Sequence, residues 1–575
     1  MRKNEALDAE NRYKSDVEKT AEYVEFFDIL ETLTNVGSDE VFTPRKVVDM
    51  MLDALPKEVW SNPDYRWLNP ASKTGIFERE IAIRLDVGLK DIIPDTETRR
   101  KHILQDMIFS IGQTKFTANV ARRTLYYCCQ ANRPCDGLME DGHYVNGYAI
   151  GNGTWFDDAE GNVKTPISNH LIKKDRCIYC GIPSNSEYLD RNQRENYSYD
   201  FIHCSPGDEI QTYLADRFFN GDRNVKFDVI IGNPPYQLSD GGGGQGTSAI
   251  PIYQKFVNQA ISLKPKYASF IIPARWMVKG KGPELKKFKD DFLNETHVLE
   301  FHRYIKSEDC FSKDIPGGVC YFLWVRDYDG PCDFVTHSAD GSEQLINKHL
   351  NEGNTDIILS DPIQESIISK VLNYMSDNDI EPVSTYVSPR CPFNLSGDVL
   401  KKEEKYSKLP LFSESKTENS FRIIGTDSGG KRICRFISNS YNFTKGSAYV
   451  NKYKIFVGKA TVGGQTLGES DEILVLSQPI LADINDVCTD SYEVIGPFNT
   501  ESESIDFVNY MRTRFFRFLL ACRLGSQNIS RQSYSFVPFL LNNNKSDDEL
   551  FALFGLDNEE KEYIQKKIGV VSWTL

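Results

Sequence analysis

Long hydrophobic runs are missing from this chain of 575 residues. No run approaches the roughly 20 apolar residues that a membrane-spanning helix needs, and the N-terminal segment is charged and polar. A disulfide framework is missing too, because the 13 cysteines are odd in number and follow no regular spacing. Such cysteines suit a reducing compartment. We therefore expect a cytoplasmic protein that is neither secreted nor anchored in a membrane.

An excess of positive charge is also absent, since 67 basic and 82 acidic residues give a formal net charge of −15. This argues against a general nucleic-acid coat protein. It still allows a site-selective binder, because local basic stripes decide such binding. A hydrophobic share of 40% with 26% charged residues describes a globular protein. The length is too great for one core and predicts roughly two to four domains.

The most informative segment is 227–236, with the sequence Phe-Asp-Val-Ile-Ile-Gly-Asn-Pro-Pro-Tyr. An apolar strand from Val229 to Ile231 leads directly into the Asn-Pro-Pro-Tyr tetrapeptide. Two consecutive prolines fix two φ angles, remove two backbone donors and disfavour a helical residue before each of them. The pattern predicts a stiff extended turn at the carboxyl end of a strand, where open α/β sheets bind their ligands.

Such a turn can hold the Asn233 side chain, the Pro234 carbonyl and the Tyr236 ring in fixed relation. The two acceptors would take the hydrogens of an exocyclic amine while the ring stacks on the planar group. The segment resembles the fourth motif, Asn/Asp/Ser-Pro-Pro-Tyr/Phe/Trp, of the N6-adenine methyltransferases that use S-adenosylmethionine. The resemblance implies that Asn233, Pro234, Pro235 and Tyr236 are catalytic, with Tyr236 stacked on a flipped-out adenine. Positioning and electrostatics would carry catalysis without a strong general base.

Two upstream segments resemble cofactor motifs of the same family. Thr43 and Pro44 predict a helix start, with Thr43 as N-cap and Pro44 at the first helical position. In the family such a start opens the tenth motif, beside the methionine carboxylate of the cofactor. Residues 67–77 are similar to the first motif, Asp-Pro-Ala-Cys-Gly-Ser/Thr-Gly-x-Phe, and lead into a helix at 78–89. The resemblance assigns the cofactor to Thr43, Pro44, Asn69, Ala71, Thr74, Gly75 and Gln113.

The cofactor segments depart from the family pattern at three positions. Asn69 stands where an acid is usual, and Lys73 stands where the first glycine is expected. Gln113 follows a predicted strand at 107–111 and precedes a predicted helix at 116–125, at the place where an acid usually bonds the ribose hydroxyls. An amide binds a diol less strongly than a carboxylate does. Either the loop takes a variant path or cofactor affinity is lowered.

An insertion rich in Cys and His separates these motifs from the tetrapeptide. Its Cys177-Ile-Tyr-Cys180-Gly sequence is the usual turn of a structural zinc knuckle. With His170 before it and His203 after it, the pattern predicts a tetrahedral Cys₂His₂ zinc site. In an alternative interpretation, residues 201–203 are the next core strand and His203 faces the cofactor. A redox pair lacks the thioredoxin-like context it would need.

After the tetrapeptide, a glycine run at 239–247 predicts either a mobile loop over the active site or a plain linker. A helix at 251–263 and strands at 268–273 and 317–325 would complete the sheet. A basic stretch suited to phosphates follows the first of these strands, with a solvated helix face as the alternative. It consists of Lys279, Lys281, Lys286, Lys287 and Lys289.

Beyond residue 327 the pattern predicts a helix at 363–375, strands at 453–459 and 473–476, and a long helix at 503–523. The last helix carries arginines away from its apolar side, namely Arg512, Arg514, Arg517 and Arg523. The stretch that follows holds Gln, Asn and Arg side chains, the types that read base edges, among them Arg531. In the family, the region after the catalytic sheet recognises the target.

We therefore predict an α/β, doubly wound (Rossmann-like) methyltransferase sheet with a Cys/His-containing insertion at about 128–204 and a mixed α+β recognition domain. The expected domains are a helical extension at 1–40, a catalytic domain at 41–327 and a recognition domain at 328–575. The resemblance implies a site-specific DNA (adenine-N6)-methyltransferase of a restriction–modification or phage-defence system. It would use S-adenosylmethionine and act on double-stranded DNA.

Three other functions compete with this one. A catalytically inactive DNA-recognition subunit could have kept the fold and lost the cofactor, which Lys73 makes conceivable. Release-factor glutamine methyltransferases share the tetrapeptide but are short, so this chain fits them poorly. A fused restriction enzyme would need a Pro-Asp…Glu-x-Lys nuclease segment, and none is evident, while the extension before Thr43 is too short for a nuclease domain. Cleavage would then require a separate nuclease or helicase partner.

Overall fold

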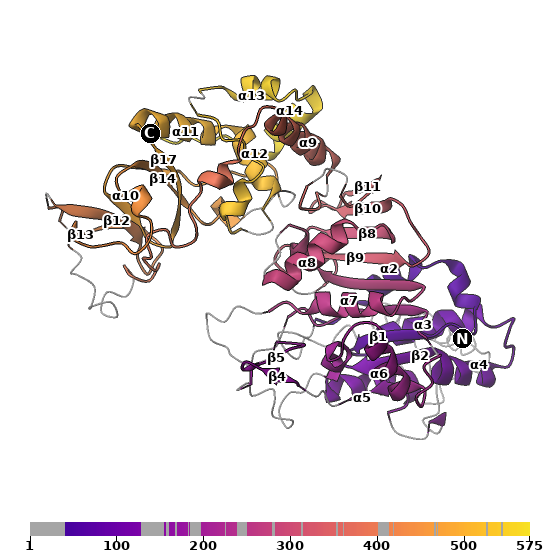
Figure 1. Cartoon of the computed structure of the whole chain (residues 1–575). Helices are drawn as coiled ribbons and strands as arrows, with labels where there is room; N and C mark the ends of the chain where they lie inside the picture. The colour runs from indigo at the N-terminus through magenta and orange to yellow at the C-terminus, as the bar shows by residue number, and fades with distance from the viewer. Residues whose placement is uncertain are drawn as a thin grey trace, which may run out of the picture. The chain divides into compact units, whose positions relative to one another are not determined.

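The structure is a computed structural model, and Figure 1 shows the whole chain. It describes residues 41–127, 155–156, 160–166, 170–181, 183–184, 197–224, 226–237, 250–278, 282–311, 314–351, 355–359, 361–400, 413, 415–417, 419–464, 467, 470–524, 527–541 and 544–574. The helical extension predicted at 1–40, the glycine run at 239–247, Lys279 and Lys281 lie outside these residues. Within the described ranges, no helix is both long enough and apolar enough to cross a membrane.

Contacts between residues divide the chain into two compact units. Unit 1 comprises Met1–Ala274, Lys281–Val335 and Asn347–Leu350, and unit 2 comprises Arg275–Gly280, Thr336–Ile346 and Asn351–Leu575. The domain boundaries drawn from the sequence at 41, 128–204 and 327 stay predictions.

A nine-stranded sheet has the order β11-β10-β8-β9-β7-β6-β1-β2-β3. Strands β3, β2, β1, β6 and β7 are parallel to one another, whereas β9 runs antiparallel to both β7 and β8. Its strands are β1 (Trp67–Ser72), β2 (Ile108–Gly112), β3 (Val163–Lys164), β6 (Val229–Gly232), β7 (Tyr267–Pro273), β8 (Val298–Tyr304), β9 (Val319–Val325), β10 (Cys332–His337) and β11 (Glu343–Lys348). The central strands β1, β6 and β7 are buried at every position, as strands covered on both faces are.

Helices cover both faces of this sheet. One core joins helices α2 and α3 to the sheet through Val48, Leu52, Ile81, Leu85, Val229 and Ile231. On the other face, Phe292 of α8 packs against Phe322 of β9 with ring centroids 5.0 Å apart. The α-helices around the sheet are α2 (Arg45–Asp53), α3 (Ile76–Gly88), α4 (Thr96–His102), α5 (Lys115–Arg122), α6 (Asp208–Phe218), α7 (Tyr253–Ser262) and α8 (Gly282–Leu293). The predicted doubly wound α/β fold is confirmed.

Shorter elements connect these helices and strands. They are η2 (Lys57–Ser61), η3 (Ile103–Met107), η4 (Arg123–Tyr127), β4 (Ile172–Lys173), β5 (Arg176–Cys177), η7 (Tyr197–Ile202), η8 (Ala274–Met277) and η9 (Ser307–Asp309). The alternative interpretation of 201–203 as a core strand is wrong, because this segment ends the 3₁₀ helix η7.

Strand β1 lies at the point where the strand order reverses. Trp67 of β1 pairs with Ile108 of β2 on one side and with Val229 of β6 on the other. In open α/β sheets the crevice at such a switch point binds the ligand. The two strands approach closely here, since a Cβ placed on Gly232 would lie 2.5 Å from Asn69 Oδ1. Only glycine therefore fits immediately before the Asn-Pro-Pro-Tyr turn.

Unit 2 contains two small sheets, ordered β13-β12-β16 and β15-β14-β17, and a group of helices. Its strands are β12 (Ser420–Thr426), β13 (Arg432–Ser438), β14 (Tyr453–Gly458), β15 (Ile480–Ala482), β16 (Asp486–Cys488) and β17 (Tyr492–Phe498). Its helices are α9 (Pro362–Asp377), η10 (Val383–Tyr386), α10 (Ser447–Val450), η12 (Val462–Gly464), α11 (Glu501–Arg512), α12 (Arg514–Cys522), η13 (Arg531–Tyr534), α13 (Asp547–Leu553) and α14 (Asn558–Lys567).

Two sequence predictions in unit 2 are wrong. The helix expected at 503–523 is divided at Thr513, whose extended backbone (φ −61°, ψ 148°) ends α11 and whose hydroxyl caps α12 by accepting from Phe516 N. Residues 473–476 are not a strand, because Val475 has a φ of 64° and only Ile473 forms a bridge, with Ile568.

Candidate functional site

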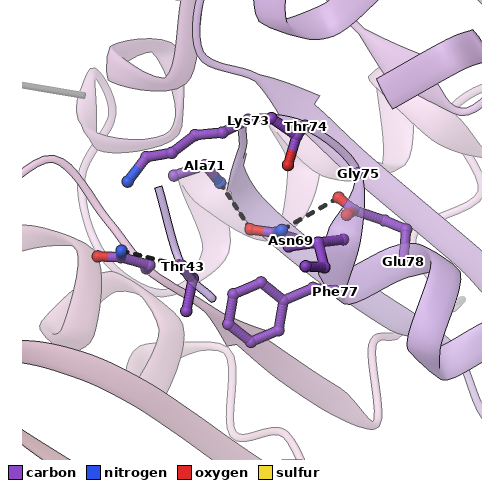
Figure 2. A pocket seen from close by; sticks show the side chains of 10 residues that line it. Thr43, Asn69, Ala71, Lys73, Thr74, Gly75, Phe77 and Glu78 are labelled. Carbon is purple, nitrogen blue, oxygen red and sulfur yellow. Dashed lines mark hydrogen bonds between the residues drawn. The ribbon is translucent and has the colours of Figure 1, made fainter. Parts of the chain in front are cut away.

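A pocket lies where β1 and β6 end. Its lining residues are Thr43, Asn69, Ala71, Lys73, Thr74, Gly75, Ile76, Phe77, Glu78 and Asn233. Figure 2 draws these residues and labels eight of them, with the side chains of Asn69 and Thr43 beside the ring of Phe77. Five of the seven residues predicted to bind the cofactor are among them, together with Asn233. Pro44 and Gln113 are not among the lining residues.

The Asn233 side chain is oriented by hydrogen bonds from one end only. Its Nδ2 donates to Thr43 Oγ1 at 2.9 Å and to the carbonyl of Val41 at 3.1 Å. Its Oδ1 is buried and accepts no hydrogen bond from the described residues. Two acceptors on the nitrogen side fix which way the amide faces. Asn233 Oδ1 is therefore a buried acceptor in a fixed position that can still take a hydrogen bond.

Thr43 has a different role from the predicted N-cap. The N-cap of α2 is Pro44, with φ −62° and ψ 149°, and no side chain caps this helix. The carbonyl of Pro44 accepts from Val47 N at 3.0 Å, which starts the helix. The Thr43 hydroxyl is 190 residues away from Asn233 in sequence and nevertheless accepts its amide hydrogen. Thr43 thus belongs to the site by orienting Asn233, which capping statistics do not predict.

Pro234, Pro235 and Tyr236 follow directly on β6. Both prolines are buried, and the partly buried Tyr236 ring packs against the core beneath α2 and α3. The Tyr236 hydroxyl has no hydrogen-bond partner among the described residues. Burial holds the pKa of Tyr236 well above its usual range, so the phenol stays protonated near neutral pH. The ring can stack on a planar group, but the hydroxyl cannot act as a base.

The loop after β1 depends on one glycine. Gly75 has a φ of 79°, and a Cβ there would lie 2.8 Å from Ala121 Cα. The preceding carbonyl, of Thr74, accepts from Thr124 Oγ1 at 3.0 Å. Gly75 therefore lets the loop turn into α3 while α5 packs closely behind it.

Lys73, which stands where the family has glycine, extends its side chain to the N-terminal segment. Its Nζ donates to the carbonyl of Val41 at 2.6 Å, the same carbonyl that accepts from Asn233. The side chain is only 7% exposed and lines the pocket. The three motifs are therefore joined through Val41, and the lysine brings a positive charge to the pocket.

Asn69, which replaces the usual acid, is paired with a carboxylate nearby. Its Oδ1 accepts from Ala71 N at 3.1 Å and its Nδ2 donates to Glu78 Oε1 at 3.0 Å, as Figure 2 shows. The second Glu78 oxygen is buried and makes no hydrogen bond of good geometry with a described residue, although the Ser72 and Ser110 hydroxyls lie near it. Burial raises the pKa of Glu78, while the side chains of Ser72, Ser110 and Asn69 act in the opposite direction.

Glu78 is a pocket residue that the sequence analysis missed. It occupies the first turn of the helix that Gly75 opens, and there it was interpreted only as a helix residue. An acid in the first turn after a glycine-containing loop was the available signal, because a helix start is a common place for ligand contacts.

Gln113 lies just beyond the carboxyl end of β2. Its backbone N donates to Ser72 O at 2.7 Å, and its carbonyl accepts from Tyr197 N of η7 at 2.8 Å. The side chain is buried, and its Oε1 has no partner among the described residues. Gln113 is thus a second buried acceptor with unused capacity at this edge of the sheet.

The structure gives a mixed result for the residues predicted to contact nucleic acid. Lys286 is exposed, but Lys287 pairs with Asp291 at 2.6 Å and Lys289 is 5% exposed. Lys289 is therefore not free to meet a phosphate as predicted. Arg531 is exposed, and its Nε donates to Ser384 O at 2.7 Å.

The predicted zinc ligands are close together: the ligand atoms of His170, Cys177, Cys180 and His203 all lie within 4.8 Å of one another.

Comparison with known proteins gives several matches. The model of the family described as Eco57I restriction-modification methylase matches residues 106–311. A protein of Mycoplasma pneumoniae (strain ATCC 29342 / M129 / Subtype 1), described as an uncharacterized adenine-specific methylase, is 47% identical over 360 residues, which are 60% of this chain and 82% of that protein.

Among solved structures, the Type IIL restriction-modification enzyme MmeI, solved in complex with DNA, is 11% identical with a TM-score of 0.42, over 85% of this chain and 65% of that one. A protein of a type I restriction-modification system is 14% identical with a TM-score of 0.28, over 54% of this chain. The present chain spans 46% of the length of that solved chain.

Proposed function

Because this chain belongs to the adenine-specific methylases of the Eco57I restriction-modification type, we propose that it methylates adenine at N6 in double-stranded DNA with S-adenosylmethionine as the donor. The observation that supports this most directly is the Asn233 amide. Thr43 and Val41 hold its nitrogen end, and its oxygen is left as a buried acceptor beside the pocket.

The chemistry of adenine explains why such an acceptor is needed. The N6 lone pair is delocalised into the ring, which makes the amine a poor nucleophile. Hydrogen bonds from N6 to Asn233 Oδ1 and to the Pro234 carbonyl would favour a more pyramidal nitrogen. Tyr236 would stack on the base after it leaves the duplex, a step that costs a few kcal/mol of unstacking. These groups act by position and charge and need no ionised base.

The residues around the pocket fit S-adenosylmethionine. When bound, the cofactor supplies an electrophilic methyl group on a sulfonium ion. The unpartnered oxygens of Glu78 and Gln113 can accept from the amino and hydroxyl groups of such a ligand. The Lys73 ammonium lines the pocket and complements a carboxylate. The other predicted residues that line the pocket, Thr43, Asn69, Ala71, Thr74 and Gly75, would shape the binding surface.

We further propose that unit 2 recognises the DNA target and that the protein serves a restriction–modification or phage-defence system with a separate nuclease or helicase partner. The zinc ion predicted for the Cys/His cluster would take no part in methyl transfer. The competing function, an inactive DNA-recognition subunit, makes a different prediction about cofactor binding.

The test is a calorimetric titration of the purified protein with S-adenosylmethionine, with and without duplex DNA, followed by a methylation assay. We expect binding, and then N6-methyladenine in the digested DNA by mass spectrometry. An Asn233→Ala protein serves as the matched control for contaminating methyltransferases. Absence of cofactor binding even with DNA present would instead identify the chain as a recognition subunit.

A further inference from the structure

We propose that His170, Cys177, Cys180 and His203 bind one structural zinc ion, which fastens the β4–β5 hairpin to the 3₁₀ helix η7. The four ligand atoms converge from two segments of the chain and lie within 4.8 Å of one another. A tetrahedral zinc ion with Zn–S bonds of about 2.3 Å and Zn–N bonds of about 2.0 Å fits among atoms at such separations.

The two cysteines occupy a turn with the shape of a metal knuckle. Gly181 N donates to Cys177 O at 2.9 Å, and Gly181 has a φ of 82°, so the chain folds back immediately after the second cysteine. Cys177 and Cys180 are 2% and 0% exposed and do not form a disulfide. Two buried thiols on one tight turn can point at a single ion.

The two histidines complete the set from either side. His170 precedes the hairpin, and its Nδ1 lies 3.5 Å from Cys180 Sγ. His203 follows η7, and both of its ring nitrogens are buried without a hydrogen-bond partner in the described part of the chain. The two rings meet with centroids 4.5 Å apart at 72°. A buried polar group without a partner is unfavourable, and a bond to zinc would satisfy one of the two ring nitrogens.

The donor set favours zinc in a structural role. Two thiolates and two imidazoles are the ligands of closed tetrahedral zinc sites, whereas a catalytic zinc keeps one position open for water. Cys204 is adjacent to His203 in sequence but is not part of the cluster. Its Sγ instead lies 3.3 Å from Gln259 Nε2. The chain thus contains a natural control cysteine beside the proposed site.

Zinc at this position would join the hairpin to the cofactor side of the sheet. Tyr197, at the start of η7, donates to the carbonyl of Gln113 at 2.8 Å. From the other side, Lys255 of α7 donates to the carbonyl of Tyr179 within the knuckle at 2.5 Å. The ion would therefore hold η7, and through it Gln113, in place. The consequence for cofactor binding rests on the proposed function, but the metal site itself does not.

The experiment measures zinc by elemental analysis in untagged full-length protein and in single variants of it. We expect about one zinc per chain, and less than about a tenth of that in Cys180→Ser and His203→Gln, because each removes one of four ligands. Cys204→Ser and the exposed Cys434→Ser should keep the full amount. Replacing zinc by Co²⁺ should give the visible absorption of a tetrahedral cobalt–thiolate site.

Three outcomes would overturn the proposal: protein without stoichiometric metal, a Cys177–Cys180 disulfide in its place, or equal zinc loss in Cys204→Ser and Cys180→Ser. If a ligand variant fails to fold, the cobalt spectrum of the unaltered protein still decides. Stripping the zinc should also weaken S-adenosylmethionine binding several-fold. A zinc-loaded protein without methylation would contradict the proposed function and leave the metal site standing.

Discussion

Buried polar side chains at the β1–β6 edge of unit 1 differ from two buried arginines of unit 2. At the β1–β6 edge of unit 1, Asn233, Glu78 and Gln113 each bury an oxygen that has no partner among the described residues. Arg517 and Arg523 of unit 2 are also buried, but their nitrogens donate to fixed acceptors. Other buried atoms of unit 2, such as Thr461 Oγ1 and the Tyr534 hydroxyl, have no partner among the described residues. Unused hydrogen-bonding capacity is costly inside a protein. At Asn233 and Glu78, which line one pocket, the unused capacity indicates a ligand site, whereas satisfied buried charge indicates a structural role.

Arg517 is an example of a buried charged side chain whose nitrogens donate to fixed acceptors. Its guanidinium donates to the carbonyls of Thr513, Leu474 and Arg512 at 3.1 to 3.3 Å. Burial lowers the pKa of Arg517 to about 10, so the group is still charged near neutral pH. Arg523 forms an ion pair with Asp356. The sequence analysis expected both arginines to project away from the apolar side of one helix, and that expectation is wrong, because both are buried.

The largest expected effect comes from removing the Asn233 acceptor in the pocket, which tests whether its free oxygen serves a ligand. Asn233→Ala should lower the methylation rate by about 10²–10³-fold, the loss typical of one oriented group that acts on the reacting atom. Its affinity for S-adenosylmethionine should stay within a few-fold, because the role of Asn233 lies at the adenine. Single-turnover methylation and calorimetry measure the two quantities separately. An equal loss of both would show that Asn233 belongs to the cofactor.

The corresponding change in unit 2 should alter stability and not chemistry. Arg517→Ala removes the buried guanidinium that donates to the carbonyls of Thr513, Leu474 and Arg512 and should lower the free energy of unfolding of unit 2 by about 3 kcal/mol. Arg512→Ala, at a half-buried neighbour whose Nη1 donates to Asn509 Oδ1 at 3.5 Å, should cost less than about 1 kcal/mol. Urea titration followed by circular dichroism compares them. Equal destabilisation by both variants would remove the architectural role of Arg517.

The sequence predicted the strands and helices that are controlled by patterns of neighbouring residues. Apolar runs, prolines and glycine act within a few residues, and they predict the strand before Asn233 and the helix after Gly75. The same signals predict the parallel strands of the sheet. The role of Thr43 could not be predicted in this way, because its partner is 190 residues away. The helix break at Thr513 was missed because the apolar periodicity continues through it. Family membership was predictable from four residues, whereas the contacts that orient them were not.

Glu78 provides a test of the cofactor side of the pocket. Glu78→Gln replaces an unpartnered acceptor by a donor and should weaken S-adenosylmethionine binding about tenfold, with little effect on the rate at saturation. Burial raises the pKa of Glu78, and only the ionised carboxylate has both oxygens as acceptors. Cofactor affinity in the unaltered protein should therefore fall as the pH is lowered through that raised pKa. The Gln variant should lack this dependence, and calorimetry at several pH values measures it.

The smallest expected effect tests how Asn233 is oriented. Thr43→Val keeps the shape of the side chain but removes the acceptor at 2.9 Å, so only the Val41 carbonyl still holds the Asn233 nitrogen. The methylation rate should fall by about fivefold to tenfold, which corresponds to the net value of one hydrogen bond of about 1 kcal/mol. Cofactor affinity should not change, and Thr43→Ser, which restores the acceptor, should recover the rate. The contrary result is that Thr43→Val weakens cofactor binding and leaves the rate unchanged. That result would show that Thr43 contacts the cofactor directly, as the resemblance to the tenth motif implied. The amide of Asn233 would then be held by Val41 alone.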